Sequence, residues 1–170
     1  TLRAESLRAV PLADFGYEMG PEPDLDVPTT LTAAFGADPV RAHIVYLRYA
    51  VDGVDEEPTR RPVTALFVER SGGWLLADDA PVIPGAVTWR GPWDHGPLHV
   101  AEVATSGGRS LVIGPTDRRD LIEATATELD SAVDAVSEVW GEEWSRRALV
   151  VATGSREEFT HQVGTRHDGE

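Results

Sequence analysis

The sequence predicts an α+β protein, in which an antiparallel β-meander is followed by a β-α-β unit. Three observations support this fold class: apolar residues alternate with polar ones between glycine-rich turns in the first half, helical spacing begins near residue 117, and a short apolar run follows. The chain has 170 residues, 41% hydrophobic and 26% charged, as expected for one globular domain or two small ones. We place a β-rich module over residues 1–92 and the β-α-β unit over residues 93–170.

The first strands are predicted from alternating side chains. Residues 7–19 should form one bulged strand or two short strands, because their large apolar side chains alternate apart from one slip. Residues 20–39 contain several prolines and predict a long loop with one helical turn at 32–35. Residues 43–51 are rich in β-branched and aromatic side chains, which is typical of a strand.

Two hairpins are predicted from glycine pairs, because glycine readily adopts the positive φ that tight turns need. The first turn is Ser71-Gly72-Gly73, and the second runs from Thr105 to Arg109. The flanking strands are 63–69 and 74–77 for the first hairpin, and 98–104 and 110–114 for the second.

A helix is predicted over residues 117–140, where apolar residues recur at helical spacing. Thr116 or Asp117 is expected to cap its first amides, and Gly141 to end it. The residues of the apolar face are Ile122, Leu129, Val133, Val136 and Trp140.

The chain after this helix completes a β-α-β unit. Residues 148–152 form an unalternated apolar run, which predicts a parallel strand buried on both faces. Ser155 and Glu158 have the spacing of a capping box and should open a final helix.

The composition excludes several function classes. A formal charge of −14 repels nucleic acids and anionic membranes, so no nucleic-acid partner is expected. The sequence contains neither cysteine nor lysine, which removes thiolate metal sites, cysteine nucleophiles and catalytic lysines. It has no Gly-x-Ser-x-Gly motif, and we assign no catalytic residue.

Aromatic residues suggest a binding site. Trp74, Trp89 and Trp93 lie within 20 residues of one another, and Tyr46 and Tyr49 lie on a predicted strand of the same meander. These side chains could line a pocket for a peptide or a small apolar ligand. The alternative is that they only cover the sheet or the seam between the two halves, because aromatic rings commonly fill cores.

The spacing of the histidines and acidic residues does not match a metal-binding motif. His95 and His99 are the nearest approach to a ligand pair, but Gly96 and Pro97 lie between them and prevent a shared helix face. His161 and His167 have no common face either, and His43 is expected at the surface or at a strand edge. The acidic groups at 52–57 and 78–79 do not fit a calcium loop, and solvated turns explain them better. No cofactor is therefore expected in this chain.

Several segments in the second half together resemble the opening of a peptidase-MA-like, gluzincin-type zinc metallopeptidase domain found in envelope proteins of high-GC bacteria. They read WDHGPLHV (93–100), SLVIG (110–114), VWG (139–141), LVV (149–151) and SREEF (155–159). The hairpin GGWLLAD (72–78) and its meander resemble the sheet of a cystatin-like or nuclear-transport-factor-two-like domain.

This resemblance implies a zinc peptidase whose metal is held by a His-Glu-x-x-His helix. No such motif occurs in these 170 residues, so none of the family's catalytic residues is carried over. The resemblance therefore implies a non-catalytic N-terminal scaffold or binding region of an extracytoplasmic or cell-envelope protein, whose partner is the remainder of a larger polypeptide. The alternative is a stand-alone domain that binds a small ligand or a protein in an aromatic pocket. The sequence carries no signal for an oligomeric state.

Overall fold

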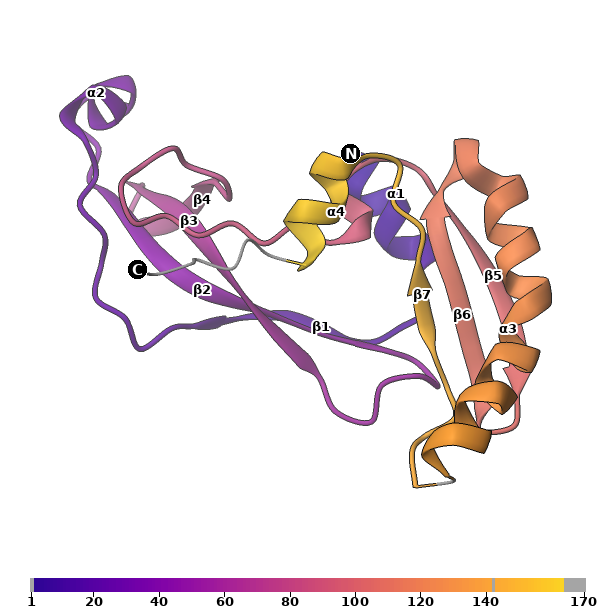
Figure 1. Cartoon of the computed structure of the whole chain (residues 1–170). Helices are drawn as coiled ribbons and strands as arrows, with labels where there is room; N and C mark the ends of the chain where they lie inside the picture. The colour runs from indigo at the N-terminus through magenta and orange to yellow at the C-terminus, as the bar shows by residue number, and fades with distance from the viewer. Residues whose placement is uncertain (1, 142, 164–170) are drawn as a thin grey trace, which may run out of the picture. The chain divides into compact units, whose positions relative to one another are not determined.

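The structure, a computed structural model, describes residues 2–141 and 143–163 (Figure 1). It confirms the α+β class. The described chain divides into two compact parts. We call residues 15–49 and 59–89 the four-stranded unit, and residues 2–14, 50–58, 90–141 and 143–163 the β-α-β unit.

The first sheet has the strand order β1-β2-β3-β4, as the meander predicts. Strands β2 and β3 are antiparallel and pair Val40 with Val68 at one end and Tyr49 with Thr59 at the other. Ser71 and Gly72 form the turn between β3 and β4 with φ values of 53° and 80°, which is the conformation of a two-residue type I′ hairpin. The strands are β1 (Leu12–Met19), β2 (Val40–Val51), β3 (Thr59–Arg70) and β4 (Gly73–Asp78).

One face of this sheet packs against its own loops. Ala42 and Leu66 are paired across β2 and β3, and both are buried with Ile83 of the loop after β4. Leu31 of helix α2 (Thr29–Thr32) and Phe35 of the 3₁₀ turn η1 (Ala33–Phe35) pack on this cluster. The predicted helical turn in the long loop is thus confirmed, and it closes a small hydrophobic core.

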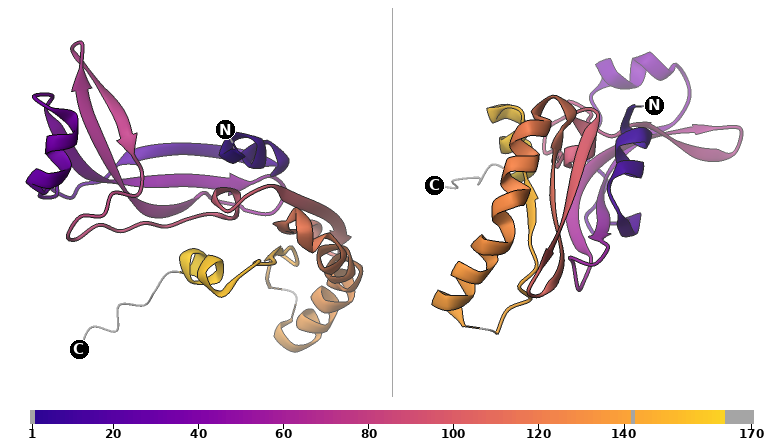
Figure 2. Two further views of the ribbon diagram at one scale, coloured as in Figure 1. Left: turned by 90° about the horizontal axis from the view of Figure 1, so that it is seen from above. Right: turned by 90° about the vertical axis from the view of Figure 1, so that its right-hand side faces the viewer.

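The β-α-β unit is built on a second sheet with the order β5-β6-β7. Strand β6 is antiparallel to β5 and parallel to β7, as the sequence predicts. Helix α3 (Arg119–Trp140) contacts β5 and β6, and helix α1 (Leu2–Ala9) lies on the other side of the sheet (Figure 2). The strands are β5 (Leu98–Thr105), β6 (Gly108–Pro115) and β7 (Leu149–Val151).

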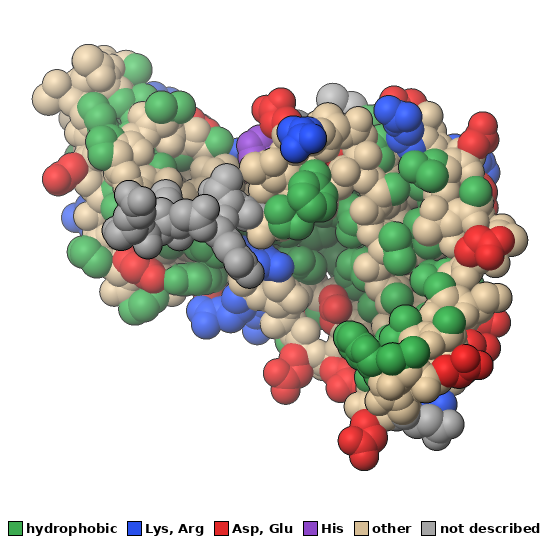
Figure 3. Space-filling view, viewed as in Figure 1, with side chains coloured by type: hydrophobic (Ala, Val, Ile, Leu, Met, Phe, Trp, Pro, Cys, Tyr) green, Lys and Arg blue, Asp and Glu red, His purple; other side chains and the backbone are tan. Residues whose placement is uncertain are grey.

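The core of this unit lies between α3 and the sheet. Ile122, Leu129 and Val133 of α3 are buried against Val112 and Ala101. Leu111 and Ile113 point to the opposite face of β6 and are buried there. Acidic side chains lie along the exposed side of α3 (Figure 3). None of the described helices has an apolar stretch long enough to cross a membrane.

Two predictions about strands are wrong. Residues 7–9 belong to α1 and not to a strand, and the buried Ser6 side chain of this helix donates a hydrogen bond to the Gly96 carbonyl oxygen at 2.5 Å, which helps to hold the helix in place. Strand β7 is half-buried, since it forms the edge of its sheet. The strand that is buried on both faces is β6.

The predicted helix ends are confirmed in part. Gly141 closes α3 with a φ of 80°, and its amide donates to the Ser137 carbonyl oxygen. The predicted N-terminal cap of α3 is wrong: the Thr116 hydroxyl donates to the Pro97 carbonyl oxygen at 3.0 Å, and a 3₁₀ turn, η3 (Thr116–Arg118), precedes the helix. The apolar face of α3 is also shorter than predicted, because Val136 and Trp140 are exposed.

Helix α4 (Arg156–Val163) begins as the capping motif predicts. The amide of Glu158 donates to the Ser155 hydroxyl at 3.1 Å. The Glu158 carboxylate is buried and accepts the Gly154 amide hydrogen at 2.6 Å, so the second half of the capping box is shifted by one residue.

Candidate functional site

A groove crosses one face of the four-stranded sheet. Its floor is formed by Val45 of β2 and by Val63, Ala65 and Phe67 of β3, which the strand register places on one face. We call this the groove face. Tyr17 and Met19 of β1 line the groove as well, and so does Leu76 of β4.

The groove consists of two adjoining pockets with volumes of about 330 and 250 Å³ that share Met19 and Phe67. Together they lie in the size range of small-molecule sites. Met19 is 66% exposed and Leu76 is 55% exposed, although both are apolar. An apolar surface of this kind is a common mark of a binding site.

One end of the groove carries a polar cluster. His43 Nδ1 lies 3.0 Å from Asp24 Oδ1, and His43 Nε2 lies 3.1 Å from the Gly20 carbonyl oxygen. Arg41 Nε lies 3.8 Å from Asp24 Oδ2, which is longer than a hydrogen bond. The Arg41 guanidinium also lies over the Trp74 ring, 5.0 Å from its centroid. This end can therefore receive a hydrogen-bonding or anionic group of a ligand.

Of the five aromatic residues predicted for a pocket, Trp74 lines the groove. Trp89 is 9% exposed and stacks on Tyr49 with ring centroids 5.4 Å apart, while Arg61 covers its ring. This arrangement gives Trp89 a structural role in its sheet. Trp93 is buried in the 3₁₀ turn η2 (Pro92–Asp94) of the β-α-β unit.

Tyr46 lies on the face opposite the groove, because it alternates with Val45 along β2. Its hydroxyl donates to Glu22 Oε1 at 2.6 Å, and the Arg60 guanidinium lies 4.8 Å from its ring centroid. The hydrogen bond from Tyr46 lowers the pKa of the Glu22 carboxyl, and the same bond raises the pKa of the Tyr46 hydroxyl.

We predict that Tyr46→Phe will return the pKa of Glu22 toward its ordinary value, because the main group that stabilises the carboxylate is lost. In the wild type, the lowered pKa of the Glu22 carboxyl stabilises the folded state at pH values above the ordinary carboxyl pKa. This stabilisation is lost as the pH falls through the lowered pKa. NMR titration of the Glu22 side chain measures this shift. Tyr49→Phe serves as a control that should leave Glu22 unchanged, and an unchanged Glu22 in Tyr46→Phe would contradict the assignment.

The histidines named as metal candidates do not meet. His99 Nε2 lies 2.7 Å from Glu123 Oε1, whereas the His95 ring stacks on His161 with centroids 5.7 Å apart. No group of three potential metal-ligating side chains occurs among residues 2–141 and 143–163. His167 lies outside the described residues. His43, predicted at the surface or at an edge, is instead half-buried on a central strand.

A pocket of about 570 Å³ lies beside His95, between the start of β5, the end of β6 and α4. Its buried acid is Glu158, whose two oxygens accept hydrogen bonds from Gly154 and Gln162. This carboxylate is therefore accounted for by the start of α4 and does not point to a ligand.

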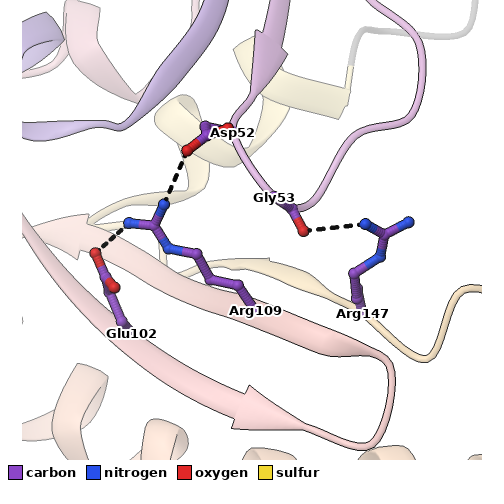
Figure 4. A network of polar contacts seen from close by, with 5 residues as sticks. All are labelled: Asp52, Gly53, Glu102, Arg109 and Arg147. Carbon is purple, nitrogen blue, oxygen red and sulfur yellow. Dashed lines mark hydrogen bonds and ion pairs between the residues drawn. The ribbon is translucent and has the colours of Figure 1, made fainter.

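The acidic loop at 52–57 contacts Arg109 of β6 and Arg147, which lies just before β7. Arg109 lies between Asp52 and Glu102 and donates to both, at 3.2 Å for Asp52 (Figure 4). Arg147 donates to the Gly53 carbonyl oxygen at 3.3 Å and to Glu56 at 2.8 Å. These contacts pair Asp52 and Glu56 of the loop with arginines.

Sequence reasoning missed most of the groove. Met19, Phe67 and Leu76 are far apart in the sequence, and only strand pairing brings them together. The available signal was the alternation of large apolar residues in β1 and the pair Leu75-Leu76 in a strand at the edge of its sheet.

Comparison of the chain with protein-family models, with curated proteins and with solved structures gives no match.

Proposed function

We propose that the four-stranded unit is a binding module that holds a small, elongated apolar ligand with an anionic end. The observation that carries this proposal is the groove, whose apolar floor and walls end at Arg41 and His43 beside Asp24, while Glu18 and Asp79 line it away from this end. The apolar part of the ligand would cover Met19, Phe67 and Leu76, which would remove their exposed surface from water. The anionic end would pair with the Arg41 guanidinium, which presents several N–H donors in one plane.

Burial on the groove floor supports a site that is already formed. Val45, Val63 and Ala65 are each at most 4% exposed, so the floor is fixed by the sheet. The side chains on the two walls are more exposed and can close on a ligand. A floor that is built in advance lowers the entropy cost of binding.

Neighbouring leucines of β4 provide a matched test. Leu76 lines the groove, and Leu75 points to the opposite face of the same strand, yet they are 55% and 54% exposed. We expect Leu76→Glu to weaken binding of decanoate about tenfold or more, because it places a charge against the alkyl chain. Leu75→Glu should bind decanoate as the wild type does. Isothermal titration calorimetry measures both affinities, and equal losses in the two variants would refute the proposal.

The polar end is tested by changing the probe. Arg41→Gln should weaken decanoate about tenfold and leave decanol nearly unchanged, because decanol carries no negative charge. Quenching of Trp74 fluorescence provides a second signal, which should be lost in Trp74→Phe. If no binding of decanoate is measured for the wild type, the groove is not a site for such ligands.

A second proposal concerns the protein that contains this chain: we propose that the chain acts as the non-catalytic scaffold region of a zinc-metallopeptidase-like envelope protein. The order β5, β6, α3, β7 and capped α4 supports it, because the sequence resemblance implies the same succession. The purified chain should hold no stoichiometric zinc by elemental analysis, whereas the complete product of its reading frame should hold one ion and cleave peptides. Peptide cleavage by this chain alone would contradict the proposal.

A further inference from the structure

The outer edge of β4 is the most accessible strand edge of the four-stranded unit. All six residues of Gly73–Asp78 are exposed, and β4 is the last strand in the sheet order. The β3–β4 hairpin projects from the rest of its sheet (Figure 2). Exposed strand edges usually carry lysine, proline or a bulge that blocks pairing with another chain. Residues 73–77 contain neither a charged residue nor proline, and the one register shift between β3 and β4 lies at Ala77, after the regular segment 73–76.

The hairpin geometry determines which backbone groups point outward. In a two-residue hairpin the pair next to the turn, here Arg70 and Gly73, is hydrogen-bonded, and hydrogen-bonded and non-bonded pairs then alternate. The backbone N–H and C=O groups of Leu75 therefore point toward β3 and form hydrogen bonds there. The N–H and C=O groups of Trp74 and Leu76 point to the free edge.

This pattern is complementary to itself. When two β4 strands run antiparallel with Leu75 opposite Leu75, Trp74 of each copy lies opposite Leu76 of the other. Both residues in such a pair have outward hydrogen-bonding groups, so four backbone hydrogen bonds form. The pairing also places Trp74 against Leu76 on the groove face, where cross-strand aromatic and aliphatic pairs stabilise sheets.

The hydrogen-bonding register favours a second copy of the chain, because the outward groups of Trp74 and Leu76 meet their complements in the same segment of another copy. The formal charge of −14 opposes this association at long range, but the edge itself is neutral. A neutral apolar segment meets an identical neutral segment, so no like charges lie directly opposite each other within residues 73–77. We therefore infer that the β4 edge is a self-association site, through which two copies of this chain join their sheets antiparallel about Leu75. The interface is short, so the dimer should be weak and concentration-dependent.

The absence of cysteine makes a sharp test available. Two Leu75→Cys chains would place their sulfur-bearing residues at a non-bonded antiparallel pair, with Cα atoms about 4.5 Å apart, which suits a disulfide. Oxidised glutathione would accept the two electrons and leave as two molecules of reduced glutathione. Gly73→Cys is the matched control on the same strand and face, because in this register its two copies lie about 13 Å apart, and a new side chain at Gly73 has room.

We expect Leu75→Cys to form a covalent dimer at least about tenfold faster than Gly73→Cys. Sedimentation velocity of the wild type should show a dimer that grows with concentration. Leu75→Lys should abolish it through repulsion of facing charges, and Val82→Lys, at a position 98% exposed, should not. Equal cross-linking rates, or a wild type that stays monomeric, would overturn the inference.

This test is separate from that of the groove, because Leu75 does not line it. Leu75→Lys should still bind decanoate. A failure of self-association would therefore leave the proposed ligand site standing. A failure of decanoate binding would likewise leave the proposed self-association site standing.

Discussion

Replacement of Ile122 by alanine will lower the free energy of unfolding of the β-α-β unit by about 2–5 kcal/mol. Ile122 is fully buried on α3 and belongs to one hydrophobic cluster with Val112, Leu129 and Val133. Truncation removes three carbon atoms from a packed core and leaves a cavity, because β6 and α3 are both held by other contacts.

The effect of Ile122→Ala is best measured by native-state hydrogen exchange, which reports on each unit separately. Amide protection in β6 should fall, while protection in β2 and β3 of the four-stranded unit should fall less. Leu121→Ala is the matched control, since Leu121 is the preceding residue on the same helix and is 53% exposed. A loss of less than about 1 kcal/mol in Ile122→Ala would show that α3 does not pack on β6 as described.

Gly107→Ala should destabilise the same unit by about 1–3 kcal/mol. A methyl group at Gly107 would overlap the Ser145 carbonyl oxygen and approach the Arg146 carbonyl carbon to 2.6 Å. The segment that leads into β7 would have to move away from the turn. That movement would break two hydrogen bonds to the Arg146 carbonyl oxygen, which accepts the Gly107 amide at 3.2 Å and the Thr105 hydroxyl at 2.7 Å.

Gly16→Ala is the control for this change. Gly16 lies in β1 with open space around the position of a new methyl group. The control should be neutral or slightly stabilising, because alanine loses less backbone freedom than glycine on folding. Thermal unfolding measured by circular dichroism compares the two variants, and equal midpoints would contradict the contact between the turn and residues 145–146.

Local patterns predict the elements that are determined by neighbouring residues. The hairpin at Ser71-Gly72 and the end of α3 at Gly141 follow from glycine's access to positive φ. The buried positions Ile122, Leu129 and Val133 follow from helical spacing. These features need no knowledge of the rest of the chain.

Features that depend on distant contacts were not predictable in the same way. Helix α1 is a short segment with weak amphipathic character, and a hydrogen bond from Ser6 to the Gly96 carbonyl oxygen, ninety positions away, helps to hold it. The groove likewise depends on the register that sets β1 and β4 on either side of β2 and β3. Closeness in sequence grouped Trp74 with Trp93, yet the two belong to different units.

The central claim is that the groove of the four-stranded unit binds an apolar ligand with an anionic end, and methyl NMR during a titration with decanoate tests it most directly. The methyl groups of Val45, Val63 and Leu76 should shift with a single saturating curve, while those of Leu75 and Val112 should stay in place. Shifts confined to exposed apolar residues elsewhere, such as Val136 and Val139 at the end of α3, would contradict it.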